Sequence, residues 1–159
     1  VEKARSKSGI TVRGIHDVSV RFSKCCSPVP GDEIVGFVTR GRGMSIHRTD
    51  CVNVINLSAA ERSRLITAEW EDPGDTEEGG QYLAELKLYA DDRRGLLLDI
   101  TKVFTEEKID VKSMNTRTSK KGTATMDMGF IVHGREELNR VIKKLRQIEN
   151  VIDIERTTG

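Results

Sequence analysis

The order of apolar patterns in the second half of the chain is the strongest constraint on its fold. Apolar and polar residues alternate at 82–90 and 124–132, as in strands with one buried face, and further strands are predicted at 109–118 and 151–155. Two helices are predicted from apolar residues at helical spacing. The first places Leu97, Ile100, Thr101, Phe104 and Lys108 on one side, with Leu96 and Val103 flanking that face. The second places Leu138, Val141, Ile142, Leu145 and Ile148 on one side. The order β-α-β-β-α-β predicts an α+β fold of the ferredoxin-like type.

The first half of the chain is predicted to form a smaller, β-rich domain. Its expected elements are strands at 10–13, 18–22, 34–39, 44–47 and 65–70 and a short helix at 59–64. The segment Arg40-Gly41-Arg42-Gly43 is expected to close a hairpin, because its glycines can adopt the backbone angles of a tight turn.

An acidic segment separates the two halves. Residues 71–80 combine Pro-Gly and Gly-Gly with acidic residues and have no apolar periodicity, which is typical of a linker. We therefore expect a first domain at 1–70, a linker at 71–80 and a second domain at 81–159. Only 4% of the 159 residues are aromatic and 32% are charged, so two small aliphatic cores fit the composition better than one large core.

Several classes of protein are excluded by composition. No apolar run approaches the roughly 18 residues of a membrane span, and the N-terminal residues do not have the charged-then-apolar pattern expected of a secretory leader. The chain opens with Val1-Glu2-Lys3, from which we expect an excised fragment. Three cysteines, two of them adjacent, do not form a disulfide framework, so a reducing, cytoplasmic setting is predicted.

All three cysteines and one histidine lie in the segment 25–51. Thiolates and imidazole are zinc ligands, and four of them fill a tetrahedral site: Cys25, Cys26, His47 and Cys51. The spacing of the last two predicts ligands on one side of a helical turn. Adjacent cysteines reach one metal only where the chain bends, and Asp50 is an alternative oxygen ligand. Burial of the cysteines as small apolar residues, with His47 hydrogen-bonded nearby, is the other interpretation, and both stay open.

The basic residues concentrate in the first domain. Residues 1–64 contain eleven lysines and arginines against six aspartates and glutamates. Because arginine binds phosphate through two parallel hydrogen bonds, this excess favours an anionic partner. The candidate contacts are Lys24, Arg40, Arg42 and Arg48, with Arg21 beside them. A solvated hairpin tip is the alternative interpretation.

Two segments resemble known families. Residues 82–156, with Asp92-Arg93-Arg94-Gly95-Leu96-Leu97 after the first strand, resemble an ACT domain, a small-ligand regulatory module. The segment Cys-Cys-Ser-Pro-Val-Pro-Gly-Asp…Arg-Gly-Arg-Gly…His-Arg-Thr-Asp-Cys resembles the zinc-finger-like, ribosome-intersubunit domain of long RelA/SpoT-type (p)ppGpp synthetase/hydrolases. Together they cover nearly the whole chain.

The resemblance implies a non-catalytic regulatory module of a bifunctional stringent-response enzyme. The parent protein is then a GTP pyrophosphokinase and (p)ppGpp hydrolase, and its catalytic domains are expected N-terminal to this region. The implied partners are the ribosome, tRNA and those catalytic domains, with zinc as the one candidate cofactor and no organic cofactor. No P-loop, His-Asp metal cluster or nucleophile triad occurs in this sequence.

The resemblance also implies an amino-acid site in the second domain. A strand that runs into a helix start leaves free N–H groups that suit a carboxylate. The expected contacts are Asp92, Arg94, Gly95, Leu96 and Leu97, with Asn115 on the neighbouring strand. The expected ligand is a branched-chain amino acid, and the domain is expected to form a homodimer. Alternatively, Gly-Leu-Leu is only a helix cap.

Two rival functions remain open. One is an ACT-type regulatory subunit of an amino-acid-metabolism enzyme, against which the cysteine segment argues. The other is a stand-alone zinc-dependent nucleic-acid binder, in which the second domain would serve only for dimerisation.

Overall fold

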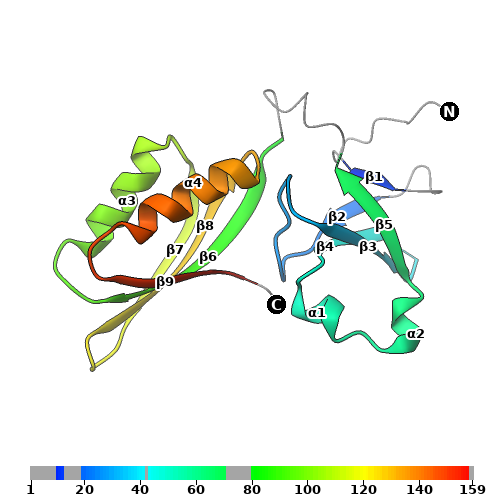
Figure 1. Cartoon of the computed structure of the whole chain (residues 1–159), viewed down its shortest axis with the longest axis horizontal. Helices are drawn as coiled ribbons and strands as arrows, with labels where there is room; N and C mark the ends of the chain where they lie inside the picture. Colours follow the sequence, from blue (N-terminus) through cyan, green and yellow to red (C-terminus); the bar gives the residue numbers. More distant parts are fainter. Residues whose placement is uncertain (1–9, 13–18, 42, 71–79, 158–159) are drawn as a thin grey trace. The chain divides into compact units, whose positions relative to one another are not determined.

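The structure is a computed structural model that describes residues 10–12, 19–41, 43–70 and 80–157. The chain divides into two compact units, with the division after Gly80. Each unit is described by itself below, with the element labels of Figure 1. The predicted linker at 71–80 lies almost wholly outside the described residues. Among these, no helix is long and apolar enough to cross a membrane.

The first unit is a five-stranded sheet with two short helices (Figure 1). Its elements are β1 (Ile10–Val12), β2 (Val20–Phe22), β3 (Ile34–Thr39), β4 (Gly43–Arg48), α1 (Val52–Ile55), α2 (Ala59–Arg62) and β5 (Leu65–Trp70). The strand order is β1-β5-β3-β4-β2, and only the β2–β4 pair is parallel. The core contains Ile10, Met44, Ile46 and Ala68, and the ring of Trp70 stacks on Phe22 at 5.7 Å.

The predicted hairpin and the strand at 65–70 are confirmed. Strands β3 and β4 pair antiparallel from Ile34 opposite Arg48 to Thr39 opposite Gly43. Gly41 and Gly43 have positive φ values of 77° and 93°, as the turn requires. The helix predicted at 59–64 ends at Arg62, and α1 was not predicted.

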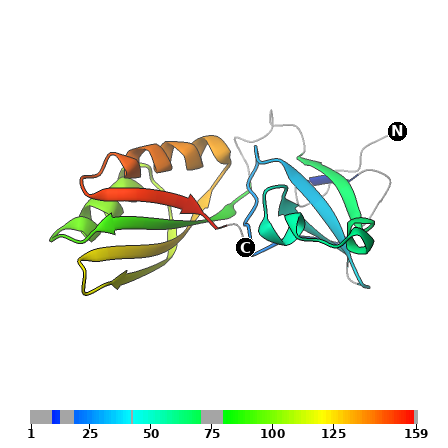
Figure 2. The ribbon, with the colours of Figure 1, turned by 60° about the horizontal axis from the view of Figure 1, so that its bottom comes forward.

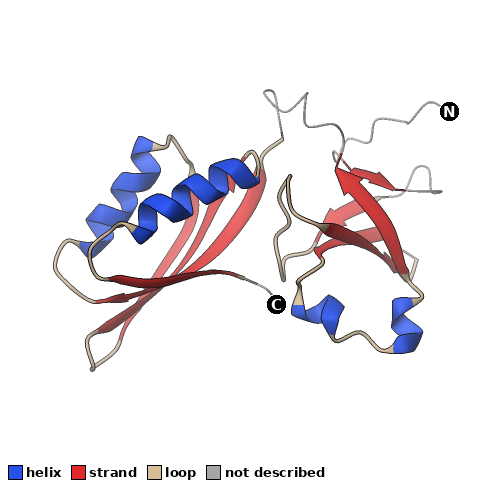
Figure 3. Ribbon diagram, in the orientation of Figure 1, coloured by secondary structure: helices blue, strands red, loops and turns tan. Residues whose placement is uncertain are grey.

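The second unit has the predicted order β-α-β-β-α-β (Figure 3). Its elements are β6 (Tyr82–Asp91), α3 (Leu96–Glu106), β7 (Val111–Thr118), β8 (Thr123–Val132), α4 (Arg135–Arg146) and β9 (Val151–Arg156). The sheet is antiparallel, with strand order β7-β8-β6-β9. Both helices cover the same face of the sheet (Figure 2).

The core of the second unit lies between the sheet and its helices. Alternate residues of β6 and β8 are buried there, as the alternating pattern predicts. The rings of Phe104 in α3 and Phe130 in β8 lie 4.9 Å apart. The buried residues of α4 are Leu138, Val141 and Leu145. The predicted α+β fold is confirmed.

The predicted face of the first helix is confirmed at Ile100 and Phe104 and was wrong at Leu97 and Lys108. Leu97 is 47% exposed, whereas the buried residues are Leu96, Ile100, Val103 and Phe104. The helix begins at Leu96, directly after the left-handed Gly95, and ends at Glu106, so Lys108 lies beyond it. Lys108 follows it with φ of 57° and belongs to the connection to β7.

Candidate metal centre and binding surfaces

A sharp turn brings the two adjacent cysteines to one place. The chain turns at residues 24–26, and the Ser27 N–H donates to the Ser23 carbonyl at 3.0 Å. Ser27 has a φ of 44°, a left-handed conformation that is uncommon for residues other than glycine. The bend that two adjacent metal ligands require is therefore present.

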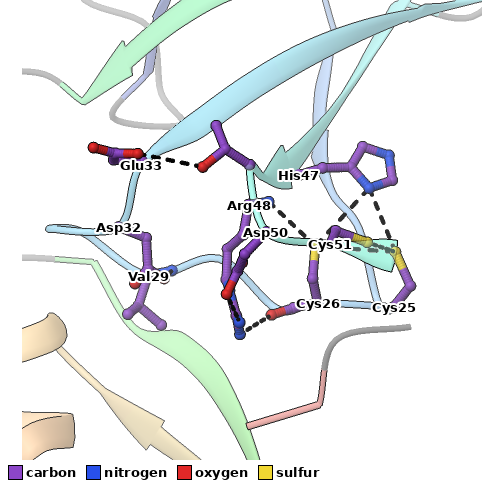
Figure 4. Close-up of polar contacts among 10 residues, drawn as sticks. Cys25, Cys26, Val29, Asp32, Glu33, His47, Arg48, Asp50 and Cys51 are labelled. Atoms are coloured by element: carbon purple, nitrogen blue, oxygen red, sulfur yellow. Dashed lines mark hydrogen bonds and ion pairs between the residues drawn. The ribbon is translucent and has the colours of Figure 1, made fainter. Parts of the chain in front are cut away.

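Four potential ligand atoms converge beside this turn (Figure 4). The sulfur of Cys25 lies 3.9 Å from that of Cys26 and 3.5 Å from that of Cys51. The Nδ1 atom of His47 lies 3.4 Å from the Cys25 sulfur and 3.9 Å from the Cys26 sulfur. All four atoms lie within 4.8 Å of one another.

These separations fit a tetrahedral metal. With Zn–S bonds of about 2.3 Å and Zn–N bonds of about 2.0 Å, neighbouring ligands of a tetrahedral site lie about 3.5–3.8 Å apart. Four of the six separations are 3.4–3.9 Å and cluster around that range, and all six lie within 4.8 Å. Four protein ligands leave no open coordination position, which is the arrangement of structural rather than catalytic zinc.

The orientation of the His47 ring also suits a metal ligand. Its Nδ1 faces the sulfurs, and its Nε2 makes hydrogen bonds with the hydroxyls of Ser23 at 2.9 Å and Ser45 at 3.2 Å. Such partners on the second ring nitrogen fix the tautomer and orientation of a ligating histidine. The predicted helical turn was wrong: His47 lies in β4, and Cys51 is the N-cap of α1.

Burial favours the neutral forms of Cys26, His47 and Cys51. Burial raises the pKa of Cys26 to about 12, raises the pKa of Cys51 and lowers the pKa of His47. A divalent cation reverses this preference for the thiols, because it stabilises the thiolate form directly.

The alternative ligand Asp50 is engaged elsewhere. Its carboxylate accepts hydrogen bonds from Arg48 Nε at 2.8 Å and Nη2 at 2.7 Å. The side chain of Arg48 is only 5% exposed, so it does not belong to a solvent-facing basic rim. The sequence analysis did not predict this Arg48–Asp50 ion pair. The signal for it is the i, i+2 spacing of an arginine and an aspartate at the end of a predicted strand.

The other candidate RNA contacts have different positions. Arg40 is exposed in the turn between β3 and β4, and Lys24 is exposed in the turn that carries the cysteines. Arg21 is exposed in β2. Arg42 lies outside the described residues.

The loop before α3 has the predicted helix start. Gly95 is the left-handed N-cap, with φ of 81°, and Asp92 and Arg94 are exposed. The Leu96 N–H donates to the Arg93 carbonyl at 3.3 Å. No acceptor among the described residues receives the N–H groups of Leu97 and Leu98, whose side chains are 47% and 71% exposed.

Asn115 does not join this loop within one chain. It lies in β7 opposite Asp127 of β8, which in turn lies opposite Lys87 of β6. Asp92 follows the end of β6, about 16 Å further along the strand at roughly 3.3 Å per residue. The prediction that Asn115 lies on the strand next to Asp92 was wrong, because β8 separates β7 from β6.

Arg93 is a residue of this loop that the sequence did not single out. Its Nη2 donates to the Asp99 carboxylate at 2.7 Å, and its Nε and Nη2 each donate to the Glu149 carbonyl at 3.3 Å. Arg93 thereby connects the start of α3 to the segment between α4 and β9 through hydrogen bonds.

The fold and site define a class: a β-rich unit with a Cys₃His cluster followed by a βαββαβ unit. Residues 10–71 match the family model of the RelA/SpoT RIS domain, and residues 78–156 match that of the ACT domain. The chain belongs to the RelA/SpoT family, of which it carries the RIS and ACT domains. The predicted family membership is confirmed.

Similar proteins agree with this assignment. The chain is 38% identical over 157 residues to a GTP pyrophosphokinase of Streptomyces coelicolor, covering 99% of this chain and 18% of that protein. It is 37% identical over 158 residues to a GTP pyrophosphokinase of Escherichia coli K12, covering 99% of this chain and 21% of that protein. The chain thus spans about a fifth of the length of these relatives and corresponds to the part that carries the RIS and ACT domains.

A solved structure is similar to the second unit. The ACT domain from a GTP pyrophosphokinase of Chlorobium tepidum is 23% identical, with a TM-score of 0.44, and the match covers 48% of this chain and 99% of that one.

Proposed function

We propose that this chain is the regulatory module of a cytoplasmic, bifunctional (p)ppGpp synthetase/hydrolase. Its RIS domain docks on ribosomal RNA and tRNA, and its ACT domain responds to a branched-chain amino acid. The observation that carries the proposal is the order of the two domains along the chain. The RIS model matches the first half and the ACT model the second half, and 99% of the chain aligns with a GTP pyrophosphokinase.

The RIS domain holds zinc through Cys25, Cys26, His47 and Cys51. The fit of their separations to a tetrahedral site supports this assignment. A closed four-ligand site supplies a cross-link rather than a reactive group. The cross-link joins the turn at 24–26, the end of β4 and the start of α1, and so holds these three segments together.

Lys24, Arg40 and Arg42 form the proposed RNA-contacting set. Arg40 and Lys24 are exposed, and cationic side chains bind phosphate without a sequence requirement. Arg48 leaves the set because its guanidinium is buried and bound to Asp50.

The amino acid binds at the start of α3. Its carboxylate lies against the backbone beside Gly95, Leu96 and Leu97, where the Leu97 N–H has no acceptor among the described residues. Asp92 accepts from the ammonium group of the amino acid. Arg94 flanks the same loop. Because Asn115 is remote within one chain, it contributes to the site only from a second copy, in the proposed homodimer through the ACT domain.

Both ligands act on the parent protein's own N-terminal catalytic domains. Each can shift the balance between alarmone synthesis and hydrolysis only by binding one conformational state better than another. In this scheme the RIS domain binds a ribosome that holds uncharged tRNA, and the ACT domain binds the amino acid when its concentration is sufficient.

Cosedimentation with ribosomes, with and without uncharged tRNA, tests the RNA proposal. The double variant Arg40→Glu and Arg42→Glu should weaken binding at least about tenfold and flatten its salt dependence, because each lost phosphate contact reduces the slope. Lys143→Glu, an exposed charge reversal in α4, is the matched control. Unchanged binding by the double variant excludes this surface.

Calorimetric titration with L-valine tests the amino-acid site. The chain should release heat with L-valine and none with D-valine, and Asp92→Ala should weaken L-valine binding. Absence of heat at millimolar L-valine rejects the sensing role while leaving the ribosome role intact.

A further inference from the structure

One buried cation lies beside the cysteine cluster. Arg48 ends β4, and its side chain is 5% exposed. A buried guanidinium is costly unless its N–H groups are paired. Its Nε and Nη2 donate to the two carboxylate oxygens of Asp50 at 2.8 and 2.7 Å, and its Nη1 donates to the Cys26 carbonyl at 3.2 Å.

The backbone of Arg48 contacts the same cluster (Figure 4). Its N–H donates to the sulfur of Cys26 at 3.3 Å, and its carbonyl accepts from the Cys51 N–H at 3.1 Å. His47 precedes it directly in the chain. One residue is therefore bonded to two of the four candidate ligands and is covalently joined to a third.

We infer that Arg48 is a positioning residue for the Cys25–Cys26–His47–Cys51 site. This inference deepens the proposed zinc-binding function and rests on it. The turn at 24–26 directs the Cys26 carbonyl toward the Arg48 guanidinium, whose Nη1 donates a hydrogen bond to it. The Arg48 N–H meanwhile directs the Cys26 sulfur toward the other ligands. Together these two bonds hold adjacent cysteines in the bend that a common ligand site requires.

The charge of Arg48 supports the same role. Three thiolates, one neutral imidazole and a divalent zinc have a formal charge of −1, and the guanidinium bound to the Cys26 carbonyl lies beside them. Asp50, whose side chain is 63% exposed, anchors Arg48 from the solvent side with the planar, two-bond geometry that arginine alone offers. Lysine in this position retains the charge but cannot bond Asp50 through both oxygens and the Cys26 carbonyl at once.

Cobalt(II) titration of the full 159-residue chain tests the inference. Thiolate-to-cobalt charge-transfer absorbance increases with the number of bound thiolates, so it reports the ligand set and not merely the fold. Arg48→Gln, Arg48→Lys and Asp50→Asn should weaken cobalt binding by about 10–100-fold, as loss of an outer partner of a metal ligand typically does. They should also lower this absorbance. Arg62→Gln, which removes an exposed arginine of the same unit, should match the wild type.

Folding is checked by circular dichroism in each variant. If Arg48→Gln does not fold, the cobalt affinity and absorbance of Asp50→Asn test the inference instead. The Asp50 side chain is largely exposed, so this substitution should not prevent folding. A folded variant that loses affinity and absorbance supports the inference. Folded Arg48 and Asp50 variants with wild-type affinity and spectrum overturn it.

A second reagent separates this inference from the zinc proposal. Phenylarsine oxide bridges two close thiols, forming two As–S bonds while the oxide oxygen leaves as water with both thiol protons. If the wild type binds no cobalt, the zinc proposal fails, but the rate of arsenical bridging still reports thiol positioning. A slower rate in Arg48→Gln and Asp50→Asn then supports the positioning role, and an unchanged rate overturns it.

Discussion

The sulfurs of Cys25 and Cys51 lie 3.5 Å apart, although 26 positions separate these residues in the chain. The segment between them contains the β3–β4 hairpin and returns to its starting point. A bond through a shared metal would therefore close a long loop and remove conformational freedom from the unfolded chain.

We predict one zinc ion per chain after purification without chelators. Loss of a hydrogen-bond partner of a metal ligand typically reduces metal affinity by about 10–100-fold. Cys51→Ser removes a ligand itself and should reduce zinc affinity by more than this. Removal of zinc should increase hydrogen exchange throughout the first unit and leave the second unit unchanged, since the two have separate cores. Elemental analysis and hydrogen-exchange mass spectrometry measure these outcomes, and substoichiometric zinc contradicts the prediction.

A glycine in the hairpin is predicted to be irreplaceable for steric reasons. A Cβ atom on Gly43 would lie 2.2 Å from the Ser19 carbonyl oxygen, and its φ is 93°. Gly43→Ala should therefore destabilise the first unit by about 1–3 kcal/mol, from strain and displacement of β2.

Gly41→Ala is the matched control for this prediction. Gly41 also has a positive φ, 77°, but a Cβ there meets no atom within 4 Å. Its cost should be about 1 kcal/mol, because only the backbone preference is lost. Urea unfolding measures both variants, and equal losses would show that the contact with Ser19 is unimportant.

The regular parts of the fold could be predicted because their burial follows a simple period. Tyr82–Asp91 and Thr123–Val132 alternate strictly, and both form long strands in the structure. Helix α1 escaped prediction because Val52, Val54 and Ile55 are β-branched residues, which favour strands on intrinsic grounds. Its short length leaves no helical period to detect.

The candidate metal ligands could be predicted from residue type, but their arrangement could not. Whether Cys25 and Cys26 reach one point depends on the left-handed Ser27 and on Arg48, which is distant from the turn in the sequence. Asn115 illustrates the same limit: its distance from Asp92 depends on strand order, which a single-strand pattern does not contain.

Arg93 is predicted to stabilise the loop that carries the proposed amino-acid site. Arg93→Ala removes the ion pair with Asp99 and the two bonds to the Glu149 carbonyl. We expect a loss of about 1–2 kcal/mol in the free energy of unfolding and faster exchange of the α3 N–H groups. Arg94→Ala, an exposed neighbour, should leave the stability within about 0.5 kcal/mol of the wild type. Equal effects of the two variants contradict this role.

Glu107 is predicted to make the second unit sensitive to acid. It is the C-cap of α3 and accepts from Lys144 and, at 3.4 Å, from Arg140, both in α4. The hydrogen bond from Lys144 holds the pKa of Glu107 below its ordinary value of 4.5. A carboxylate with a lowered folded-state pKa contributes stability above its unfolded-state pKa, and that contribution disappears as the pH falls through the folded-state pKa.

Glu107→Gln should therefore be less stable than the wild type at neutral pH, and the difference should shrink progressively below about pH 4.5. Urea midpoints of the second unit between pH 7 and pH 3 measure this convergence. Glu106→Gln, a neighbouring exposed substitution, should follow the wild-type pH dependence. If the Glu107→Gln and wild-type midpoints stay equally far apart at every pH, the ion pairs between α3 and α4 do not account for the acid sensitivity.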